Sequence, residues 1–174
     1  MLKDSLGRVW QCGTIQIDFS LPERFKLEYL DKKGRVKRPA VIHRAIAGSL
    51  ERFFAILVEH YAGSFPLWLS PVQLIILPIS DRFQDYALKV KEELEKEGFR
   101  VELNNDNKTL GAKIRETTLQ KIPYMVIIGE RESESYKVHQ VYQVTVRTRE
   151  GEDLGTISIR EFISKLKSQI EKFL

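Results

Sequence analysis

Residues 73–79 read Gln-Leu-Ile-Ile-Leu-Pro-Ile, an almost continuous apolar run. A short run of this kind, without polar alternation, is typical of a strand that is buried on both faces. Strands of this type lie inside sheets that helices cover on both sides. The run therefore predicts the central strand of an α/β domain.

Helical and strand patterns alternate after this run. Helical spacing is present over residues 83–97 and 108–121, and an amphipathic helix closes the chain over residues 159–173. Strand patterns fall at residues 99–103, at residues 124–128 and within residues 138–147. This alternation predicts a mixed or parallel sheet covered by helices, in a domain of about 100 residues.

A different pattern precedes the run. Residues 64–71, Ser-Phe-Pro-Leu-Trp-Leu-Ser-Pro, carry two prolines and form the best candidate linker. Residues 9–19 alternate between polar and apolar side chains, which predicts a strand with one polar face. Residues 25–30 and 36–42 flank a polar stretch that ends in glycine, so a hairpin and an antiparallel sheet are expected there.

An apolar helix is expected before the linker. Over residues 48–61 the apolar side chains recur at helical spacing, with Ser49 as the expected cap and Gly63 as the expected stop. A hairpin, one strand and this helix cannot cover their own apolar side chains. We therefore expect residues 1–70 to be part of a larger domain, or to dock onto another chain.

Composition excludes several classes of protein. With 43% hydrophobic and 30% charged residues, a chain of 174 residues is ordinary globular material, neither disordered nor fibrous. A formal charge of +4 is compatible with a polyanionic partner. The single cysteine, Cys12, excludes an internal disulfide and a cysteine-built zinc site, and it fits a reducing compartment.

Targeting and motif signals are equally sparse. The first residues contain no apolar run before a small-residue cleavage site, so a cytoplasmic location is expected. Residues 65–79 are interrupted by three prolines and fall short of the roughly 20 residues that a membrane helix needs. The chain has no G-x-x-x-x-G-K loop, no G-x-S-x-G elbow and no C-x-x-C, which argues against an independent nucleotide hydrolase, esterase or metal module.

Three strings carry a family resemblance. They are Trp-Gln-Cys-Gly-Thr-Ile-Gln-Ile-Asp-Phe at 10–19, Ile-His-Arg-Ala-Ile-Ala-Gly-Ser-Leu-Glu-Arg-Phe at 42–53, and Pro-Leu-Trp-Leu-Ser-Pro-Val-Gln at 66–73. In order and spacing they resemble the end of the catalytic domain of threonyl-tRNA synthetases. Residues 111–116, 122–125 and 146–149 resemble the anticodon-binding domain of the same family, which related synthetases for proline, histidine and glycine share.

The resemblance implies a fold and a division of the chain. Residues 1–70 would be the end of a class II catalytic core, a fragment of its antiparallel sheet with the helix of the last motif. Residues 71–174 would be the anticodon-binding domain, a three-layer α/β structure with a mixed sheet. The first two class II motifs and any editing domain would then lie outside this chain.

The implied function is threonine–tRNA ligase activity. In the family, ATP with Mg²⁺ activates threonine as threonyl-adenylate, and the threonyl group then passes to threonine tRNA. The family works as a homodimer in the cytoplasm, and neither a membrane nor DNA is an expected partner. The alternative is a separate module or regulator that binds the tRNA anticodon without catalysis.

The resemblance also implies residue roles in the catalytic core. Arg52 matches the arginine that reaches the ATP γ-phosphate, a catalytic task suited to a bidentate guanidinium. Five further residues match positions that line the ATP and threonine pockets: Gln11, Thr14, Gln16, Gly48 and Ser49. On the residues alone, Arg52 reads more simply as a solvated helix arginine and Ser49 as a helix cap. Gln11, Thr14 and Gln16 read as the polar face of a strand.

His43 matches a zinc ligand of the family. There a cysteine and two histidines hold zinc, which binds the threonine amino and hydroxyl groups. Only this ligand is present, because the family's zinc cysteine would precede the chain. From the residues alone, a histidine at a strand end that bonds to a neighbour is the simpler interpretation.

Four residues match positions that read the threonine anticodon in the family: Asn107, Arg115, Glu132 and Arg147. Amides, carboxylates and guanidinium groups suit the Watson–Crick edges of loop bases. The simpler interpretations are a helix cap for Asn107, a solvated helix residue for Arg115, and loop or strand-edge charges for the other two. The connection over residues 133–143 is longer than the family's, and it could let His139 or Tyr142 add a stacking contact.

Overall fold

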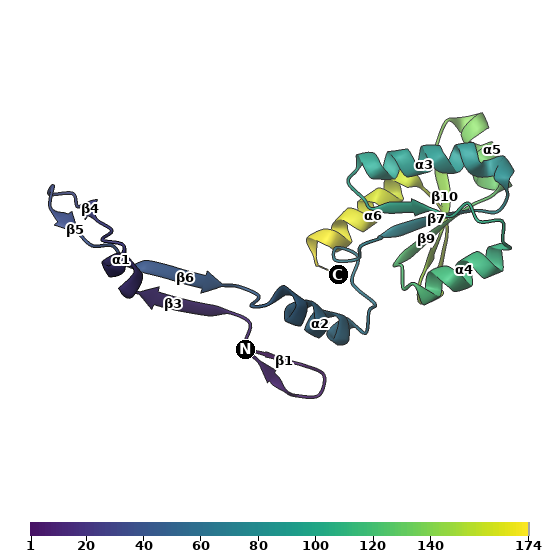
Figure 1. Cartoon of the computed structure of the whole chain (residues 1–174). Coiled ribbons are helices and arrows are strands. Elements are labelled where there is room, and N and C mark those ends of the chain that lie inside the picture. The colour runs from purple at the N-terminus through teal and green to yellow at the C-terminus, as the bar shows by residue number, and fades with distance from the viewer. Residues whose placement is uncertain (174) are drawn as a thin grey trace. The chain divides into compact units, whose positions relative to one another are not determined.

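The amino-terminal part of the chain is built from antiparallel strand pairs and one longer helix (Figure 1). In the computed structural model, which describes residues 1–173 apart from the side chains of Lys137 and His139, this part forms a compact unit over Met1–Ala62. A second compact unit begins at Gly63. The sequence analysis placed the end of the first domain at residue 70 and the start of the second at residue 71, and these bounds stay a prediction.

Three strand pairs make up the first unit. Strand β1 (Leu2–Lys3) pairs with β2 (Val9–Trp10), and β4 (Tyr29–Leu30) pairs with β5 (Val36–Lys37). The longest pair joins β3 (Thr14–Asp18) to β6 (Val41–Ala45). All three are antiparallel, which confirms the predicted hairpin and the predicted direction of the sheet.

The prediction of one strand over residues 9–19 is wrong. Strand β2 pairs with β1 and β3 pairs with β6, so the chain changes partner between Trp10 and Thr14 and leaves the extended ladder there. Gly48 lies against this break: its φ is +72°, and a β-carbon on it would lie 2.9 Å from the carbonyl oxygen of Cys12. Only glycine satisfies both conditions.

Two helices follow the strands of the first unit. Helix α1 (Ser20–Arg24), which the sequence did not indicate, begins where Asp18 Oδ1 accepts hydrogen bonds from the amides of Ser20 and Leu21. Helix α2 (Leu50–Tyr61) begins at the cap Ser49, whose Oγ accepts from the Arg52 amide at 3.3 Å, as predicted. It ends at Ala62 in the left-handed conformation, just before Gly63.

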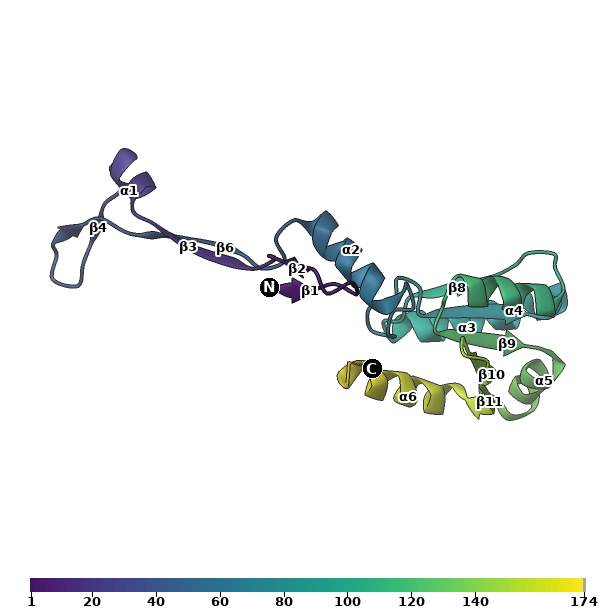
Figure 2. The same cartoon turned by 90° about the horizontal axis from the view of Figure 1, so that it is seen from below.

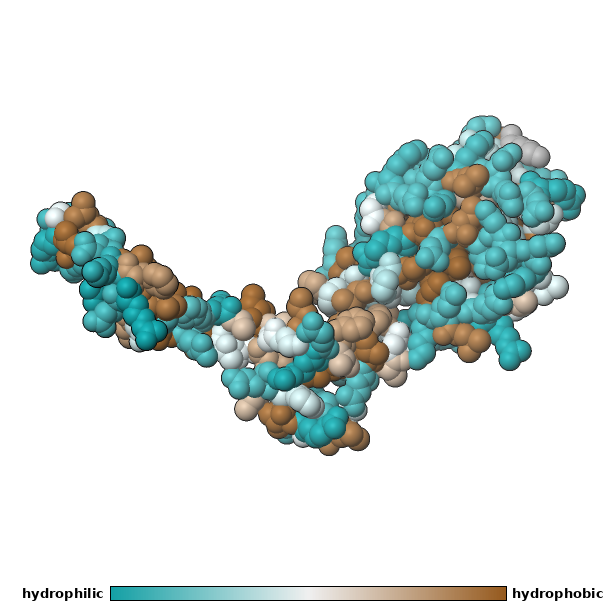
Figure 3. All heavy atoms as spheres, viewed as in Figure 1, coloured by the Kyte–Doolittle hydropathy of each residue, from teal (hydrophilic) through white to brown (hydrophobic). Residues whose placement is uncertain are grey.

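Apolar side chains of the first unit remain uncovered, as expected from the sequence. None of the residues of α2 is buried. On the longest strand pair Ile15, Ile17 and Ile42 are each more than 60% exposed. Figure 3 shows hydrophobic side chains on the surface of this unit. A surface of this kind normally packs against another part of a protein.

The second unit has a five-stranded sheet in the order β11-β10-β9-β7-β8. Its strands are β7 (Leu74–Pro78), β8 (Val101–Leu103), β9 (Tyr124–Ile128), β10 (Gln143–Thr148) and β11 (Asp153–Ser158). Strand β7 is parallel to β8 and β9, whereas β10 is antiparallel to β9 and β11. The predicted mixed sheet is therefore confirmed.

Helices cover both faces of this sheet, giving three layers (Figures 1 and 2). Helices α3 (Gln84–Lys96) and α6 (Ile159–Glu171) pack on the face that carries Leu74 and Ile76. Helix α4 (Leu110–Leu119) packs on the opposite face, against Ile75 and Leu77. Every residue of β7 is buried, as the apolar run predicts.

Two elements of this unit were not anticipated from the sequence. Helix α5 (Glu130–His139) occupies most of the long connection, and the strand expected within residues 138–147 is β10, which begins at Gln143. Most residues of α5 are polar or charged, so the sequence shows no apolar side chains at helical spacing there. Strand β11 was also missed, because Gly155 and its polar neighbours weaken the alternation.

Two arginines hold the proline-rich stretch that was predicted as a linker, residues 64–71, in place within the second unit. The guanidinium of Arg100 donates to the carbonyl oxygens of Trp68, Ser70 and Pro71. The guanidinium of Arg149 donates to the carbonyl oxygen of Phe65 at 2.6 Å. Charge-assisted bonds to several carbonyls fix an irregular segment that has no ladder of its own.

Among residues 1–173, none of the helices combines the length and the apolar character needed to cross a membrane.

Two neighbouring threonines of α4 make a matched test of this packing. Oγ1 of Thr117 is buried and has no hydrogen-bond partner among the described residues, whereas the Thr118 hydroxyl donates to the Ile114 carbonyl at 2.9 Å. We expect Thr117→Val to raise the free energy of unfolding by about 1 kcal/mol, because it removes an unpaired buried hydroxyl at nearly constant shape. Thr118→Val should change it by less than about 0.5 kcal/mol. Urea unfolding of the full chain measures both, and a destabilised Thr117→Val would contradict the assignment.

Candidate functional site

The carboxyl ends of three strands meet at one edge of the second unit's sheet. Strands β7, β8 and β9 run parallel, so the loops that follow them lie together. A cavity of about 180 Å³ opens at this edge. It is lined by polar and charged side chains with one apolar residue: Ile79, Ser80, Asp81, Asp106, Asn107, Lys108 and Lys113. Polar groups gathered at the carboxyl edge of a sheet are a common setting for ligand binding.

Asn107 lines this cavity from the loop between β8 and α4. The cap of α4 is Thr109, whose Oγ1 accepts from the Ala112 amide, so the simpler interpretation of Asn107 as a helix cap is wrong. The loop is shaped by Asn104, whose Oδ1 accepts from the Asp106 amide at 2.9 Å. The amide of Asn107 is therefore presented by a turn that neighbouring residues hold.

Lys113 closes the floor of the cavity from α4. Only 5% of its surface is exposed, and its Nζ donates to the carbonyl oxygens of Pro78 and Asn104 at 3.1 and 3.3 Å. These carbonyls belong to the end of β7 and to the residue after β8. A buried ammonium thus joins the two loops that border the cavity, a role that the sequence did not indicate.

Glu132 lies at the same edge, in the first turn of α5. It is 6% exposed; its Oε2 accepts from the Gly129 amide at 2.9 Å, and its Oε1 accepts from the Thr145 hydroxyl at 2.6 Å. A β-carbon on Gly129 would lie 2.8 Å from Cδ1 of Ile79, which lines the cavity. Glu132 is therefore a buried helix residue that follows β9, and the simpler interpretation as a loop charge is wrong.

The other two residues predicted to read the anticodon lie on α4 and β10. Arg115 is exposed on α4, in agreement with its simpler interpretation as a solvated helix residue. Arg147 is half-buried on β10, opposite Met125 of β9. Neither lines the cavity. Of the four predicted residues only Asn107 lines the cavity, whereas Glu132 bonds to Thr145, which stands two residues from Arg147 on the same face of β10.

Three tyrosines, one of them in α5, form a cluster. The rings of Tyr136 and Tyr142 stack with centroids 4.4 Å apart, and Tyr86 packs against both. The hydrogen bond with Tyr136, reinforced by burial, raises the pKa of Tyr142 to about 12. Tyr142 thus stacks within the protein, and the stacking contact considered for His139 lies outside the described side chains.

In the first unit, β3 and β6 present a polar face. Gln16 is the register partner of His43, and Thr14 and Asp18 occupy the same side of β3. A shallow hollow of about 560 Å³ is lined by Gln16, Asp18 and His43 among others. His43 Nε2 lies 3.1 Å from Asp18 Oδ2, and the Leu21 amide followed by this imidazole lowers the pKa of Asp18. The structure thus brings Thr14, Gln16 and His43 to one face.

The remaining predicted residues of the first unit lie near the start of α2. The guanidinium of Arg52 lies 5.4 Å from the centre of the Trp10 ring, a cation–π distance. Ser49 caps the helix and also donates to Glu51 Oε2, while Gly48 packs on Cys12. Gln11 is exposed in the break between β2 and β3.

Comparisons with known proteins match each unit separately. Residues 73–169 match the family described as "Anticodon binding domain", and residues 1–61 match the "tRNA synthetase class II core domain (G, H, P, S and T)". A threonine–tRNA ligase of Caldanaerobacter subterraneus subsp. tengcongensis is 53% identical over 97% of this chain, and one of Methylobacillus flagellatus is 54% identical over 97%. The chain belongs to the threonyl-tRNA synthetase family.

Solved structures agree with this membership. The crystal structure of the RNA binding domain of a threonyl-tRNA synthetase from Cryptosporidium parvum is 42% identical, with a TM-score of 0.81, and covers 96% of this chain and 41% of that chain. A prolyl-tRNA synthetase of the same organism, at 23% identity and a TM-score of 0.66, covers 94% of this chain and 34% of that one; it shares the fold. The chain spans only 25% of the first relative and 26% of the second.

Zinc binding does not fit the residues that this member of the synthetase family provides. Among the described residues, no group of three or more histidine, cysteine, aspartate or glutamate side chains could hold a metal ion. His43 pairs with Asp18 alone, and Cys12 is buried next to Gly48. Structural and catalytic zinc sites need three or four ligands, so these units do not form one by themselves.

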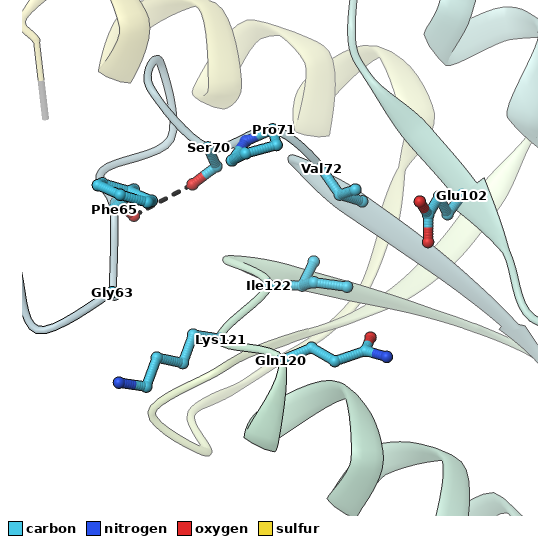
Figure 4. Close-up of a pocket in the computed structure, with 9 residues that line it drawn as sticks. All are labelled: Gly63, Phe65, Ser70, Pro71, Val72, Glu102, Gln120, Lys121 and Ile122. Atoms are coloured by element: carbon cyan, nitrogen blue, oxygen red, sulfur yellow. Dashed lines mark hydrogen bonds between the residues drawn. The ribbon is translucent and has the colours of Figure 1, made fainter. Parts of the chain in front are cut away.

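A second cavity lies in the second unit, beside the proline-rich residues 64–71 (Figure 4). None of the predicted site residues lines it. Its volume is about 340 Å³. Phe65, Ser70 and Pro71 border it on one side, and Gln120, Lys121 and Ile122 border it on the other. The Ser70 hydroxyl donates to the Phe65 carbonyl within this wall. The cavity is thus formed by the proline-rich segment and the loop after α4.

The buried ammonium of Lys113 generates a stability prediction. Lys113→Met leaves the carbonyls of Pro78 and Asn104 without this donor, so we expect a loss of about 1–3 kcal/mol in the free energy of unfolding. The control is Lys108→Met, whose exposed ammonium pairs with Glu116 and Asp106. The control should cost clearly less, because exposed ion pairs contribute little. Urea unfolding of both variants checks this, and equal losses would contradict the role of Lys113.

The turn at the amino terminus generates a pH prediction. Hydrogen bonds from the indole of Trp10 and from Arg8 lower the pKa of Asp4 to about 2. A carboxyl whose pKa is lowered stabilises the fold above its unfolded pKa, and this contribution is lost as the pH falls toward about 2. The indole N–H resonance of Trp10 should report the transition, and Asp4→Asn should abolish it. A resonance that stays constant down to about pH 2 would contradict the pairing.

Proposed function

We propose that this chain is part of a cytoplasmic threonine–tRNA ligase, in which the second unit reads the anticodon of threonine tRNA. The observation that carries the proposal is the polar cavity lined by Asn107, within the unit that matches an anticodon-binding family. Glu132 lies in the first turn of α5, after β9, which is parallel to β7. An amide and a carboxylate can pair with the Watson–Crick edges of unstacked loop bases. Arg115 and Arg147 would contact the same loop from outside the cavity.

The first unit contributes groups for ATP and threonine in this proposal. Arg52 would neutralise charge on the γ-phosphate, and Mg²⁺ would accompany ATP. Gln11, Thr14, Gln16, Gly48 and Ser49 would line the two pockets. Adenylate formation is a displacement at phosphorus, which depends on alignment and charge neutralisation more than on a protein base. These residues would hold and orient the reactants in a site that further class II elements complete.

Uncovered apolar surface supports this view of the first unit. Ile15, Ile17 and Ile42 are exposed on β3 and β6, and no residue of α2 is buried. The rest of a class II core would cover such a face, and the homodimer of the family would form through that core. His43 would act as a zinc ligand only together with ligands that residues 1–173 do not supply.

A stand-alone anticodon-binding module without catalysis is the less favoured function. The relatives are named as ligases, and residues 1–61 match a class II core. A pure binding module has no need of the polar strand face that carries Gln16 and His43. We therefore keep the proposal that this chain is part of a ligase.

Binding of the full chain to threonine tRNA tests the anticodon proposal. A tRNA with a changed anticodon serves as the control, and both are titrated with salt because phosphate contacts weaken with salt without reading sequence. We expect the changed anticodon to weaken binding at least about tenfold, which corresponds to about 1.4 kcal/mol. Equal, salt-sensitive binding of both tRNAs would overturn the proposal.

Two neighbouring asparagines provide a matched pair of variants. Asn105 and Asn107 are both exposed in the same loop, but only Asn107 lines the cavity. Asn107→Ala should reduce the discrimination between the two tRNAs, because it removes an amide that pairs with a base. Asn105→Ala should leave the discrimination unchanged. A similar loss in both variants would indicate an effect on the loop as a whole and would argue against direct reading by Asn107.

A further inference from the structure

Two threonines on adjacent strands lie in line with the carboxylate of Glu132. The Thr145 hydroxyl, on β10, is 2.6 Å from Glu132 Oε1. The Thr156 hydroxyl, on β11, is 2.8 Å from the Thr145 hydroxyl. Thr145 and Thr156 are register partners in the antiparallel ladder, so their side chains lie on the same face of the sheet. The three groups form a continuous chain of short hydrogen bonds.

The direction of these bonds follows from the number of protons. A carboxylate only accepts hydrogen bonds, whereas a hydroxyl has one proton to donate and lone pairs to accept with. The Thr145 proton is therefore used on Glu132, and Thr145 must accept the proton of Thr156. Hydrogen bonds in such a chain polarise one another, which strengthens the bond that reaches the carboxylate.

This Thr156–Thr145–Glu132 relay of hydrogen bonds is complemented by a second bond to the carboxylate, from the start of α5. The Gly129 amide donates to Oε2 at 2.9 Å, and Thr145 donates to Oε1. With one bond on each oxygen, the plane of the carboxylate is fixed. A carboxylate offers about four acceptor positions, so roughly one on each oxygen remains for a ligand. These donors are neutral, so the negative charge of Glu132 is not cancelled by them.

We propose that Thr145 is a positioning residue that sets the plane of the Glu132 carboxylate for a base edge with N–H donors, and that Thr156 orients the Thr145 hydroxyl. This inference rests on the proposed function of the second unit. A carboxylate that must pair with two adjacent N–H groups needs its plane aligned with that of the base. Rotation of the carboxylate would remove discrimination while leaving contacts with the phosphates intact.

Three variants of the full chain test the relay. Thr145→Val removes the hydroxyl at nearly constant shape in a strand, and valine is a strong strand former. Thr145→Ser keeps the hydroxyl and is the conservative rescue. Thr156→Val removes the outer hydroxyl alone. Each variant is bound to threonine tRNA and to a tRNA with a changed anticodon, and its thermal unfolding is recorded.

We expect Thr145→Val to lower the discrimination between the two tRNAs about tenfold, with binding to the changed tRNA preserved. Thr145→Ser should retain discrimination, and Thr156→Val should lose part of it. Full discrimination in Thr145→Val would overturn the proposal. An equal loss of binding to both tRNAs, or no rescue by serine, would also overturn it, because that is the result of a merely structural role.

A second measurement separates this inference from the anticodon proposal. The carboxyl ¹³C resonance of Glu132, recorded without tRNA, should shift in Thr145→Val and return in Thr145→Ser. If the unaltered chain does not discriminate between the tRNAs, the proposed function fails, and a resonance that shifts and returns still supports the relay. A resonance that does not change in Thr145→Val overturns the relay whatever the tRNA result.

Discussion

The complete burial of β7 is the constraint on which the second unit depends. Each residue of this strand is buried, with Leu74 and Ile76 on one face and Ile75 and Leu77 on the other. A strand without a wet face needs hydrogen-bonding neighbours on both sides and covering layers above and below. Strands β8 and β9 supply the neighbours, and three helices supply the layers. Because both neighbours are parallel to β7, three loops leave the sheet at a single edge.

Polar side chains gather at that edge because backbone groups there need hydrogen-bond partners. Carbonyls at the ends of parallel strands have no further ladder partner, so other groups must bond to them. The Lys113 ammonium donates to the carbonyls of Pro78 and Asn104, and the Glu132 carboxylate accepts from the amide of Gly129 at the start of α5. Lys113, which helps to complete the fold, also lines the cavity. The group that stabilises this edge therefore also lines a cavity, whereas in the first unit the predicted residues lie on the β3–β6 pair and around the start of α2.

Much of this organisation could be predicted from the residues. The apolar run placed β7, helical spacing placed α2, α3, α4 and α6, and the family strings placed the two units in their class. Helix α5 escaped prediction because its apolar support comes from the tyrosine cluster, in which Tyr86 is distant in sequence. Strand β11 forms a hairpin with β10 and escaped because Gly155 and its polar neighbours weaken the alternation. The break between β2 and β3 escaped for a related reason, since alternation does not reveal a change of pairing partner.

By itself, the sequence determined the class of the protein, the covered strand, the capped helices and the set of polar residues available for recognition. Only the tertiary structure decided which of those residues meet. Asn107 reaches the cavity because β7 and β8 run parallel and end at the same edge, whereas Arg115 does not line it. The bond between Glu132 and Thr145 is likewise a product of strand order, because sheet neighbours are chosen by packing over the whole core rather than by local pattern.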